Sequence, residues 1–178
     1  MGRGIAWISI ALVALMIPTI GAVGTVSAVS LPNDRPVADL EGQPIVVSEI
    51  SDWFCHDLDY PQIHCFRTAA SLDRALSVQR NAAALGVAGA LAALPYVVVY
   101  RDSSLQGAYF AISQSYDNLS SIGWNDAVSS FRAVNGLYGH FATDALNAGR
   151  LYPTFCCNLQ VPYVGDSWND QFSSVYPW

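Results

Sequence analysis

The sequence WNDAVSSF, Trp124–Phe131, returns 44 residues later as WNDQFSSV, Trp168–Val175. Five of the eight positions are identical, including the Trp-Asn-Asp start and the paired serines. A repeat with this period indicates one supersecondary unit that occurs twice. Two copies are too few for a solenoid, so we expect two units that share one core.

Each copy follows a stretch with the pattern of a β-hairpin. Tyr96–Tyr100 (YVVVY) is β-branched and aromatic, Arg101–Gly107 is a turn region, and Ala108–Ser113 predicts the return strand. In the second unit the corresponding stretch is Leu137–Phe155. Further short strands are predicted to begin at the paired serines, over Ser129–Val134 and Ser173–Tyr176. Residues 95–178 are therefore predicted to be mainly β.

The repeated segment is rich in hard oxygen donors. Asn, Asp and Ser offer amide, carboxylate and hydroxyl oxygens and no soft ligand, and Ca²⁺ takes six to eight such oxygens. One copy supplies too few, whereas two copies that face each other can supply two sites. The simpler alternative is that Asn-Asp caps a turn, the serines start a strand and the tryptophans, Trp124 and Trp168, belong to the core.

On these residues the stretch Tyr96–Trp178 resembles a βγ-crystallin domain of the bacterial, secreted, calcium-binding type. The resemblance implies two Greek-key motifs that form a small sandwich. The family's calcium signature is two Asn/Asp residues, two free positions and then Ser/Thr-Ser, and both copies satisfy it. In the first hairpin Tyr100 and Gly107 match the family pattern, while Leu105 stands where the family has an aromatic residue; in the second, Leu146 takes that place.

The resemblance implies two calcium ions, each shared between the units. Asp126 and Ser173 would serve one ion, and Asp170 and Ser129 the other. Backbone carbonyls would complete the shells, within each turn and near the hairpins: Ala127, Gln171, Arg101 and Ala142. Asn125 and Asn169 belong to the same candidate set, chiefly as residues that shape the turns, whereas Ser130 and Ser174 would begin strands.

Residues 1–28 read as an export signal. Ile5–Ile20 is almost wholly apolar, Arg3 is the only charge before Asp34, and small residues precede a cleavage site after Ala28. We expect a secreted protein. The alternative is an uncleaved membrane anchor through residues 5–22, and contact with a membrane is expected only in that case.

Residues 29–94 form a predicted cysteine-containing N-terminal segment with one helix. Thr68 is a candidate N-cap, and Leu72 and Leu76 share one stripe. Four cysteines in an exported chain suggest disulfides, and the least demanding pairing is Cys55–Cys65. Cys156 and Cys157 would then form a vicinal disulfide or remain free thiols, and the pairings that cross to the N-terminal segment stay open. A zinc site within Cys55-His56…His64-Cys65 is a further alternative.

Composition excludes several functions. The chain has eight basic residues, all Arg, against 14 acidic residues, giving a net charge of −6. We therefore expect no nucleic-acid partner, and the absence of Lys excludes P-loop and Schiff-base chemistry. No catalytic constellation can be assembled, so we expect no enzyme. The predicted function is secreted calcium binding, in which calcium stabilises the fold.

Two alternatives use the same fold. One is a secreted inhibitor whose disulfide-bounded loop, Asp57–His64, enters an extracellular peptidase. The other is an antimicrobial or toxin-like protein. The acidity of the chain disfavours the second, because anionic membranes attract basic residues.

Overall fold

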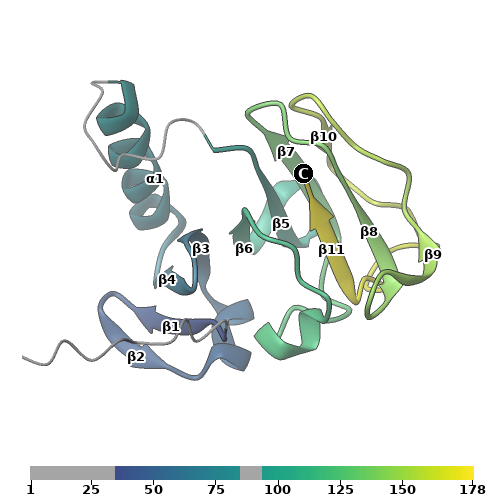
Figure 1. Cartoon of the computed structure of the whole chain (residues 1–178), viewed down its shortest axis with the longest axis horizontal. Helices are drawn as coiled ribbons and strands as arrows, with labels where there is room; N and C mark the ends of the chain where they lie inside the picture. The colour runs from purple at the N-terminus through teal and green to yellow at the C-terminus, as the bar shows by residue number, and fades with distance from the viewer. Residues whose placement is uncertain (1–34, 85–93) are drawn as a thin grey trace, which may run out of the picture. The chain divides into compact units, whose positions relative to one another are not determined.

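The computed structural model of the chain describes residues 35–84 and 94–178 (Figure 1). The predicted export signal, its cleavage site and the membrane-anchor alternative lie outside the described residues, as does most of Ala82–Leu94. In the two described ranges, no helix combines the length and hydropathy needed to cross a membrane.

The described residues form two β-sheets and one α-helix (Figure 1). The larger sheet has the strand order β10-β7-β5-β6-β3-β4-β1-β2, and the smaller has the order β11-β8-β9. The strands are β1 Val37–Leu40, β2 Gln43–Ile45, β3 Phe54–Asp59, β4 Gln62–Phe66, β5 Tyr96–Asp102, β6 Gln106–Ile112, β7 Ser130–Val134, β8 Gly139–Asp144, β9 Ala148–Leu151, β10 Gln160–Val161 and β11 Ser174–Pro177. The helices are α1 Ala69–Ala84 and the 3-10 helices η1 Val47–Asp52, η2 Ser103–Leu105 and η3 Leu119–Ile122.

Strands β5 and β6 confirm the predicted hairpin of the first unit, and β7 and β11 confirm the strands predicted at the paired serines. β6 covers the predicted return strand, while β7 and β11 begin at Ser130 and Ser174, the second serine of each pair. β5 pairs antiparallel with β6 on one side and with β7 on the other. The mainly β character of residues 95–178 is therefore confirmed.

Strand β5, in the middle of the larger sheet, is buried on both faces. In β5 the side chains alternate: Val97 and Val99 belong to the main core, which also takes in the smaller sheet, while Tyr96, Val98 and Tyr100 belong to a second apolar cluster with helix residues. Because both faces are covered, the five consecutive residues Tyr96–Tyr100 are all buried. This explains the continuous apolar run YVVVY.

Helix α1 covers the outer face of the larger sheet. Its predicted start is confirmed, because the hydroxyl oxygen of Thr68 accepts a hydrogen bond from Ser71 N at 3.2 Å. Leu72 and Leu76, the predicted stripe, are buried in the second apolar cluster. The helix follows β4, so the predicted N-terminal position of the helical segment is corrected.

Four strands, β1 to β4, precede the helix and were not predicted. β1 and β2 have four and three residues, too few to show an alternating pattern, and the polar residues of β3 and β4 resemble a loop. β3 pairs in parallel with β6, with Cys55 opposite Phe110 and His56 opposite Ala111. The two predicted segments, 29–94 and 95–178, therefore contribute strands to one sheet.

Each repeat also gives a short segment to the sheet of the other. β10 of the second repeat pairs with β7 of the first, and Tyr116 of the first forms a bridge with Val175 in β11. These exchanges interlock the repeats around the shared core that the duplication predicts. The Greek-key arrangement itself stays a prediction.

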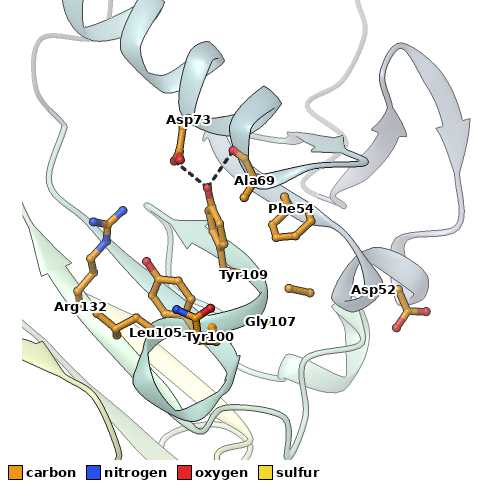
Figure 2. Close-up of a pocket in the computed structure, with 11 residues that line it drawn as sticks. Asp52, Phe54, Ala69, Asp73, Tyr100, Leu105, Gly107, Tyr109 and Arg132 are labelled. Atoms are coloured by element: carbon orange, nitrogen blue, oxygen red, sulfur yellow. Dashed lines mark hydrogen bonds between the residues drawn. The ribbon is translucent and has the colours of Figure 1, made fainter.

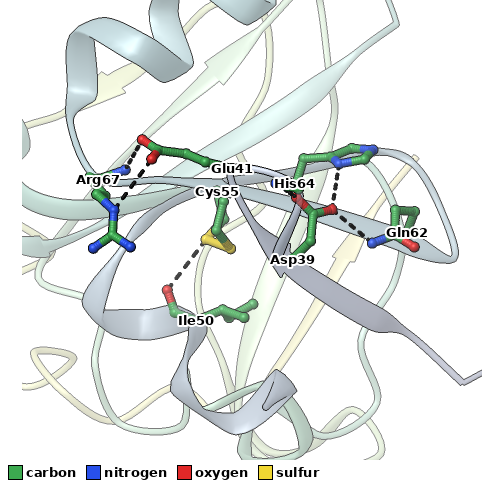
Figure 3. Close-up of a disulfide and its surroundings, with 9 residues drawn as sticks. Asp39, Glu41, Ile50, Cys55, Gln62, His64 and Arg67 are labelled. Carbon is green, nitrogen blue, oxygen red and sulfur yellow. Dashed lines mark hydrogen bonds and ion pairs between the residues drawn. A yellow bond between two sulfur atoms is a disulfide. The ribbon is translucent and has the colours of Figure 1, made fainter. Parts of the chain in front are cut away.

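The disulfide Cys55–Cys65 is confirmed, and it joins directly opposed residues of β3 and β4 (Figure 3). Cys156 and Cys157 form a vicinal disulfide, which resolves the open alternative. The described range therefore contains no free thiol. A zinc site at Cys55 and Cys65 is excluded as well, because both sulfurs are bonded to each other.

Removing the Cys55–Cys65 bond should destabilise the protein clearly. The bond joins cysteines that are 10 residues apart in the sequence. For a loop of this length the chain-entropy model gives a stabilisation of about 2.5 kcal/mol. The double variant C55A/C65A should lower the free energy of urea unfolding by this amount. In the matched control C156A/C157A the bond joins adjacent residues, so the same relation gives a smaller loss of about 1 kcal/mol. Equal losses in the two variants would contradict the explanation.

Candidate metal sites

The two Asn-Asp turns have the same local structure. Asp126 and Asp170 both have a φ of 53°, in the left-handed region that Asp and Asn tolerate better than most residues. In each turn the preceding asparagine amide donates to the aspartate: Asn125 Nδ2 to Asp126 Oδ2 at 2.6 Å, and Asn169 Nδ2 to Asp170 Oδ2 at 2.7 Å. Asn125 and Asn169 therefore shape the turns and orient the carboxylates.

Backbone bonds hold each turn against the opposite repeat. Asp126 N donates to Phe172 O at 3.0 Å, and Asp170 N donates to Val128 O at 3.3 Å. The acceptors are the residues immediately before Ser173 and Ser129. Each turn is therefore fixed beside the first serine of the other copy, as a site shared between the repeats requires.

One predicted pair meets through its side chains. The hydroxyl of Ser129 lies 3.4 Å from Asp170 Oδ1, across 41 residues of sequence. The other pair, Asp126 and Ser173, is brought together by the backbone bond from Asp126 N to Phe172 O. The cross-repeat pairing is thus closer at Asp170 and Ser129.

The hairpin carbonyls nearest the serines are those of Tyr100 and Ala142. Ser129 N donates to Tyr100 O at 3.0 Å, and Ser173 N donates to Ala142 O at 2.9 Å. The repeat therefore relates Ala142 to Tyr100, and the predicted Arg101 is one residue beyond. The guanidinium of Arg101 points elsewhere and pairs with Asp52 at 3.1 Å.

The remaining predicted carbonyl donors follow the aspartates in each turn. Ala127 packs against the main core, so its backbone is fixed by burial. Gln171 is exposed, and its side-chain amide donates to the carbonyl oxygen of Asp170 at 2.8 Å. The two positions are equivalent in sequence and differ in side-chain contacts.

The second serine of each signature donates a hydrogen bond to the backbone of the hairpin in the same repeat. Ser130 Oγ donates to Asp102 O at 2.6 Å, and Ser174 Oγ donates to Asp144 O at 2.8 Å. Both serines are fully buried. They are structural residues, in agreement with their predicted place at strand starts.

The two hairpins match despite their departures from the family pattern. Ser104 and Leu105 have φ values of 62° and 58°, and Leu146 and Asn147 have values of 60° and 59°. Gly107 has positive φ as well, and a Cβ there would lie 2.6 Å from Asp102 Oδ2. In both hairpins a left-handed turn is therefore followed by a glycine, Gly107 or Gly149, at a position with no room for a side chain.

The donor set fits a hard cation. The hydroxyl of Ser129 lies beside the carboxylate of Asp170, and Asn169 Oδ1 is buried with no hydrogen-bond partner among the described residues. Sequence reasoning missed Asp166, whose carboxylate accepts a hydrogen bond from Tyr163 OH at 2.7 Å. That bond first, then partial desolvation and the charges of Asp166 and Asp170, raise the pKa of Tyr163.

The two Asn-Asp turns are not accompanied by a cluster of nitrogen or sulfur ligands in the described part of the chain. Over residues 35–84 and 94–178, no group of three or more His, Cys, Asp or Glu side chains is arranged to hold a metal. The imidazole of His64 pairs with Asp39 at 2.8 Å (Figure 3). His140 bonds Asn147 at 2.6 Å.

The tryptophans of the repeat differ in burial. Trp124 is fully buried in the main core, as predicted. Trp168 is partly buried against that core, and the guanidinium of Arg150 lies 4.6 Å above its ring. Both therefore lie close to the turns without supplying an oxygen donor.

The loop considered for a peptidase inhibitor is largely inside the fold. Asp57 is fully buried and Leu58 is nearly so, leaving an exposed tip over Asp59–Pro61. Pro61 O also accepts a hydrogen bond from Val37 N at 3.0 Å. The exposed tip is therefore shorter than the predicted loop Asp57–His64.

No family model and no curated protein matches the chain. Solved structures do match. A βγ-crystallin from Ciona intestinalis has 24% identity and a TM-score of 0.42, covering 47% of this chain and 99% of that one. About half of the chain is similar in structure to βγ-crystallin domains. A βγ-crystallin domain from Clostridium beijerinckii has 23% identity and a TM-score of 0.40, and the match covers 47% of this chain and 97% of that one. A domain from Flavobacterium johnsoniae has 26% identity and a TM-score of 0.40, and the match covers 46% of this chain and 92% of that one.

Proposed function

We propose that the chain binds two calcium ions and that bound calcium stabilises its fold. One ion would be held by Asp126 and Ser173, and the other by Asp170 and Ser129. The observation that carries the proposal is the contact of 3.4 Å between Ser129 Oγ and Asp170 Oδ1, which joins the two copies of the signature.

The chemistry of the donors supports calcium among the biological cations. Hydroxyl, carboxylate and carbonyl oxygens are the ligands of Ca²⁺, which accepts six to eight of them in flexible geometry. The net charge of −6 further favours a cation over an anion. Transition metals, by contrast, select imidazole and thiolate ligands.

We also propose that the protein acts outside the cell. The predicted export signal supports this, and the Cys55–Cys65 disulfide agrees with it because disulfides persist in oxidising compartments. Extracellular calcium modules bind in the range of about 10⁻⁴–10⁻³ M. Calcium outside the cell would therefore occupy the sites.

Isothermal titration tests the proposal. The purified chain should bind about two calcium ions, and Ser129→Ala or Ser173→Ala should each leave about one. Alanine keeps the backbone bond from residue 129 to Tyr100 O and from residue 173 to Ala142 O, so only the hydroxyl ligand is lost.

Ser115→Ala, at an exposed serine outside both copies of the signature, is the matched control and should leave both ions bound. Circular dichroism of each variant checks that the fold is intact. Retention of both ions by Ser129→Ala would contradict the assignment of that hydroxyl. The absence of binding heat together with unchanged tryptophan fluorescence would overturn the function.

A further inference from the structure

A cavity of about 630 Å³ lies between helix α1 and the outer face of the larger sheet (Figure 2). Its walls come from α1, from β3, from β7 and from the β5–β6 hairpin. Its volume is within the range of about 300–1,000 Å³ that is typical of small-molecule sites. It is lined by Asp52, Phe54, Asp73, Tyr100, Tyr109 and Arg132, among others.

Three aromatic rings form its apolar surface. Tyr100 and Tyr109 have ring centroids 5.2 Å apart, and Phe54 meets Tyr109 edge to face, also at 5.2 Å. Figure 2 shows Tyr109 between Phe54 on one side and Tyr100 on the other. Such a surface suits a flat or ring-shaped ligand body, since aromatic contacts add to the gain from burial.

The carboxylates around the cavity are already engaged. Asp73 accepts a hydrogen bond from Tyr109 OH at 2.8 Å, and Asp52 pairs with Arg101 at 3.1 Å. Neither carboxylate neutralises Arg132. The acidic groups of the cavity are therefore satisfied by the protein itself.

Arg132 is not satisfied in this way. Its Nε atom is buried without a hydrogen-bond partner, and no carboxylate of the described residues forms an ion pair with it. Tyr100 lines the same cavity, so its hydroxyl is a second candidate donor for a ligand there. A buried donor without an acceptor is destabilising, so a ligand oxygen at this point would be bound favourably.

Burial raises the pKa of Tyr100, and the positive charge of Arg132 opposes this rise. Arg132 and Tyr100 line the same cavity, and Figure 2 shows both side chains at it. A planar carboxylate matches the fork of an arginine and accepts hydrogen bonds from both residues. A phosphate dianion would be repelled more strongly by Asp73 and Asp52, which stand at the same cavity.

We propose that this cavity binds a small aromatic monocarboxylate, with its carboxylate on Arg132 and Tyr100 and its ring against Tyr109 and Phe54. The cavity and one proposed calcium site share the β5–β6 hairpin, because Tyr100 O accepts the hydrogen bond from Ser129 N at 3.0 Å. The proposed ligand contacts of the cavity use side chains instead: the guanidinium of Arg132, the hydroxyl of Tyr100 and the rings of Tyr109 and Phe54.

Titration with 3-phenylpropionate tests the proposal, with 3-phenylpropanamide as the uncharged analogue. The acid should bind at least about tenfold more tightly than the amide, because only the acid offers a charged bidentate acceptor. Arg132→Gln should weaken binding of the acid by at least about tenfold and leave the amide unchanged. Tyr100→Phe should weaken binding of the acid by about three- to tenfold, because the variant lacks the hydroxyl.

The matched control is Arg67→Gln, which removes an exposed arginine paired with Glu41 outside the cavity and should leave binding unchanged (Figure 3). Amide chemical shifts should move at β5, β6 and β7. Equal affinity for acid and amide would overturn the proposal, as would displacement of the acid by equimolar inorganic phosphate. The absence of acid binding up to about 10 mM would overturn it as well.

Discussion

Calcium at a hundredfold excess over its dissociation constant should raise the free energy of unfolding by about 5 kcal/mol. Each site that exists only in the folded chain contributes about 2.7 kcal/mol at this excess, and the two sites act together. For a chain of this size the melting temperature should rise by about 10–20 °C. Calorimetric melting in calcium and in chelator measures the difference.

The double variant D126N/D170N is the control for this shift. Asn tolerates the positive φ of both positions, so the turns should form and the midpoint in chelator should stay near that of the unmodified chain. The loss of two carboxylates should remove most of the gain in calcium. A calcium-dependent shift of the same size in the double variant would show that calcium binds elsewhere, and no shift in the unmodified chain would defeat the proposal.

The paired turns were predictable from the sequence because their information is local. Spacing alone aligned Trp124–Phe131 with Trp168–Val175, and a repeat must place equivalent residues in equivalent positions. The contact between Ser129 and Asp170 then follows only if the two copies face each other. Which hairpin carbonyl would complete each shell depends on strand register, which spacing does not determine, so Arg101 and Ala142 stay predictions.

The first four strands were not predictable because their pairing is not local. β1 is parallel to β4, and β3 is parallel to β6, more than forty residues away. One signal did exist. The uninterrupted apolar run Tyr96–Tyr100 indicates a strand that is covered on both faces, and this predicts a further layer outside the sandwich. That layer is α1, which also forms a wall of the cavity lined by Arg132.

Removing Asp57 or His56 should reveal opposite dependences of stability on pH. Burial raises the pKa of Asp57 from 3.8 to about 6, although Ser113 N and Tyr116 OH donate to its oxygens at 2.6 and 3.0 Å. Burial first, and then the charge of His64, lower the pKa of His56 from 6.5 to about 4, against the smaller opposing effects of Asp59 and Asp39.

The signs follow from which state binds more protons. Between about pH 4 and 6 folded Asp57 binds the proton more tightly than the unfolded chain does, so its contribution is present at low pH and is lost as the pH rises through 6. Folded His56 binds the proton more weakly, so its contribution is present above pH 6.5 and is lost as the pH falls through about 4. A tenfold change in proton affinity corresponds to about 1.4 kcal/mol, so each contribution is about 3 kcal/mol.

In the unmodified chain these two contributions nearly cancel over the same pH window. Asp57→Asn keeps an acceptor for Ser113 N and exposes the His56 dependence, so its stability relative to the unmodified chain should fall by about 3 kcal/mol from pH 7 to pH 4. The stability of His56→Gln relative to the unmodified chain should rise by a similar amount over the same pH interval. Urea unfolding followed by tryptophan fluorescence at four pH values measures both differences, and the groups common to all three proteins cancel in the comparison. Parallel curves would mean that neither burial displaces a proton equilibrium, and the strand β3 would then carry its two buried ionisable side chains without cost.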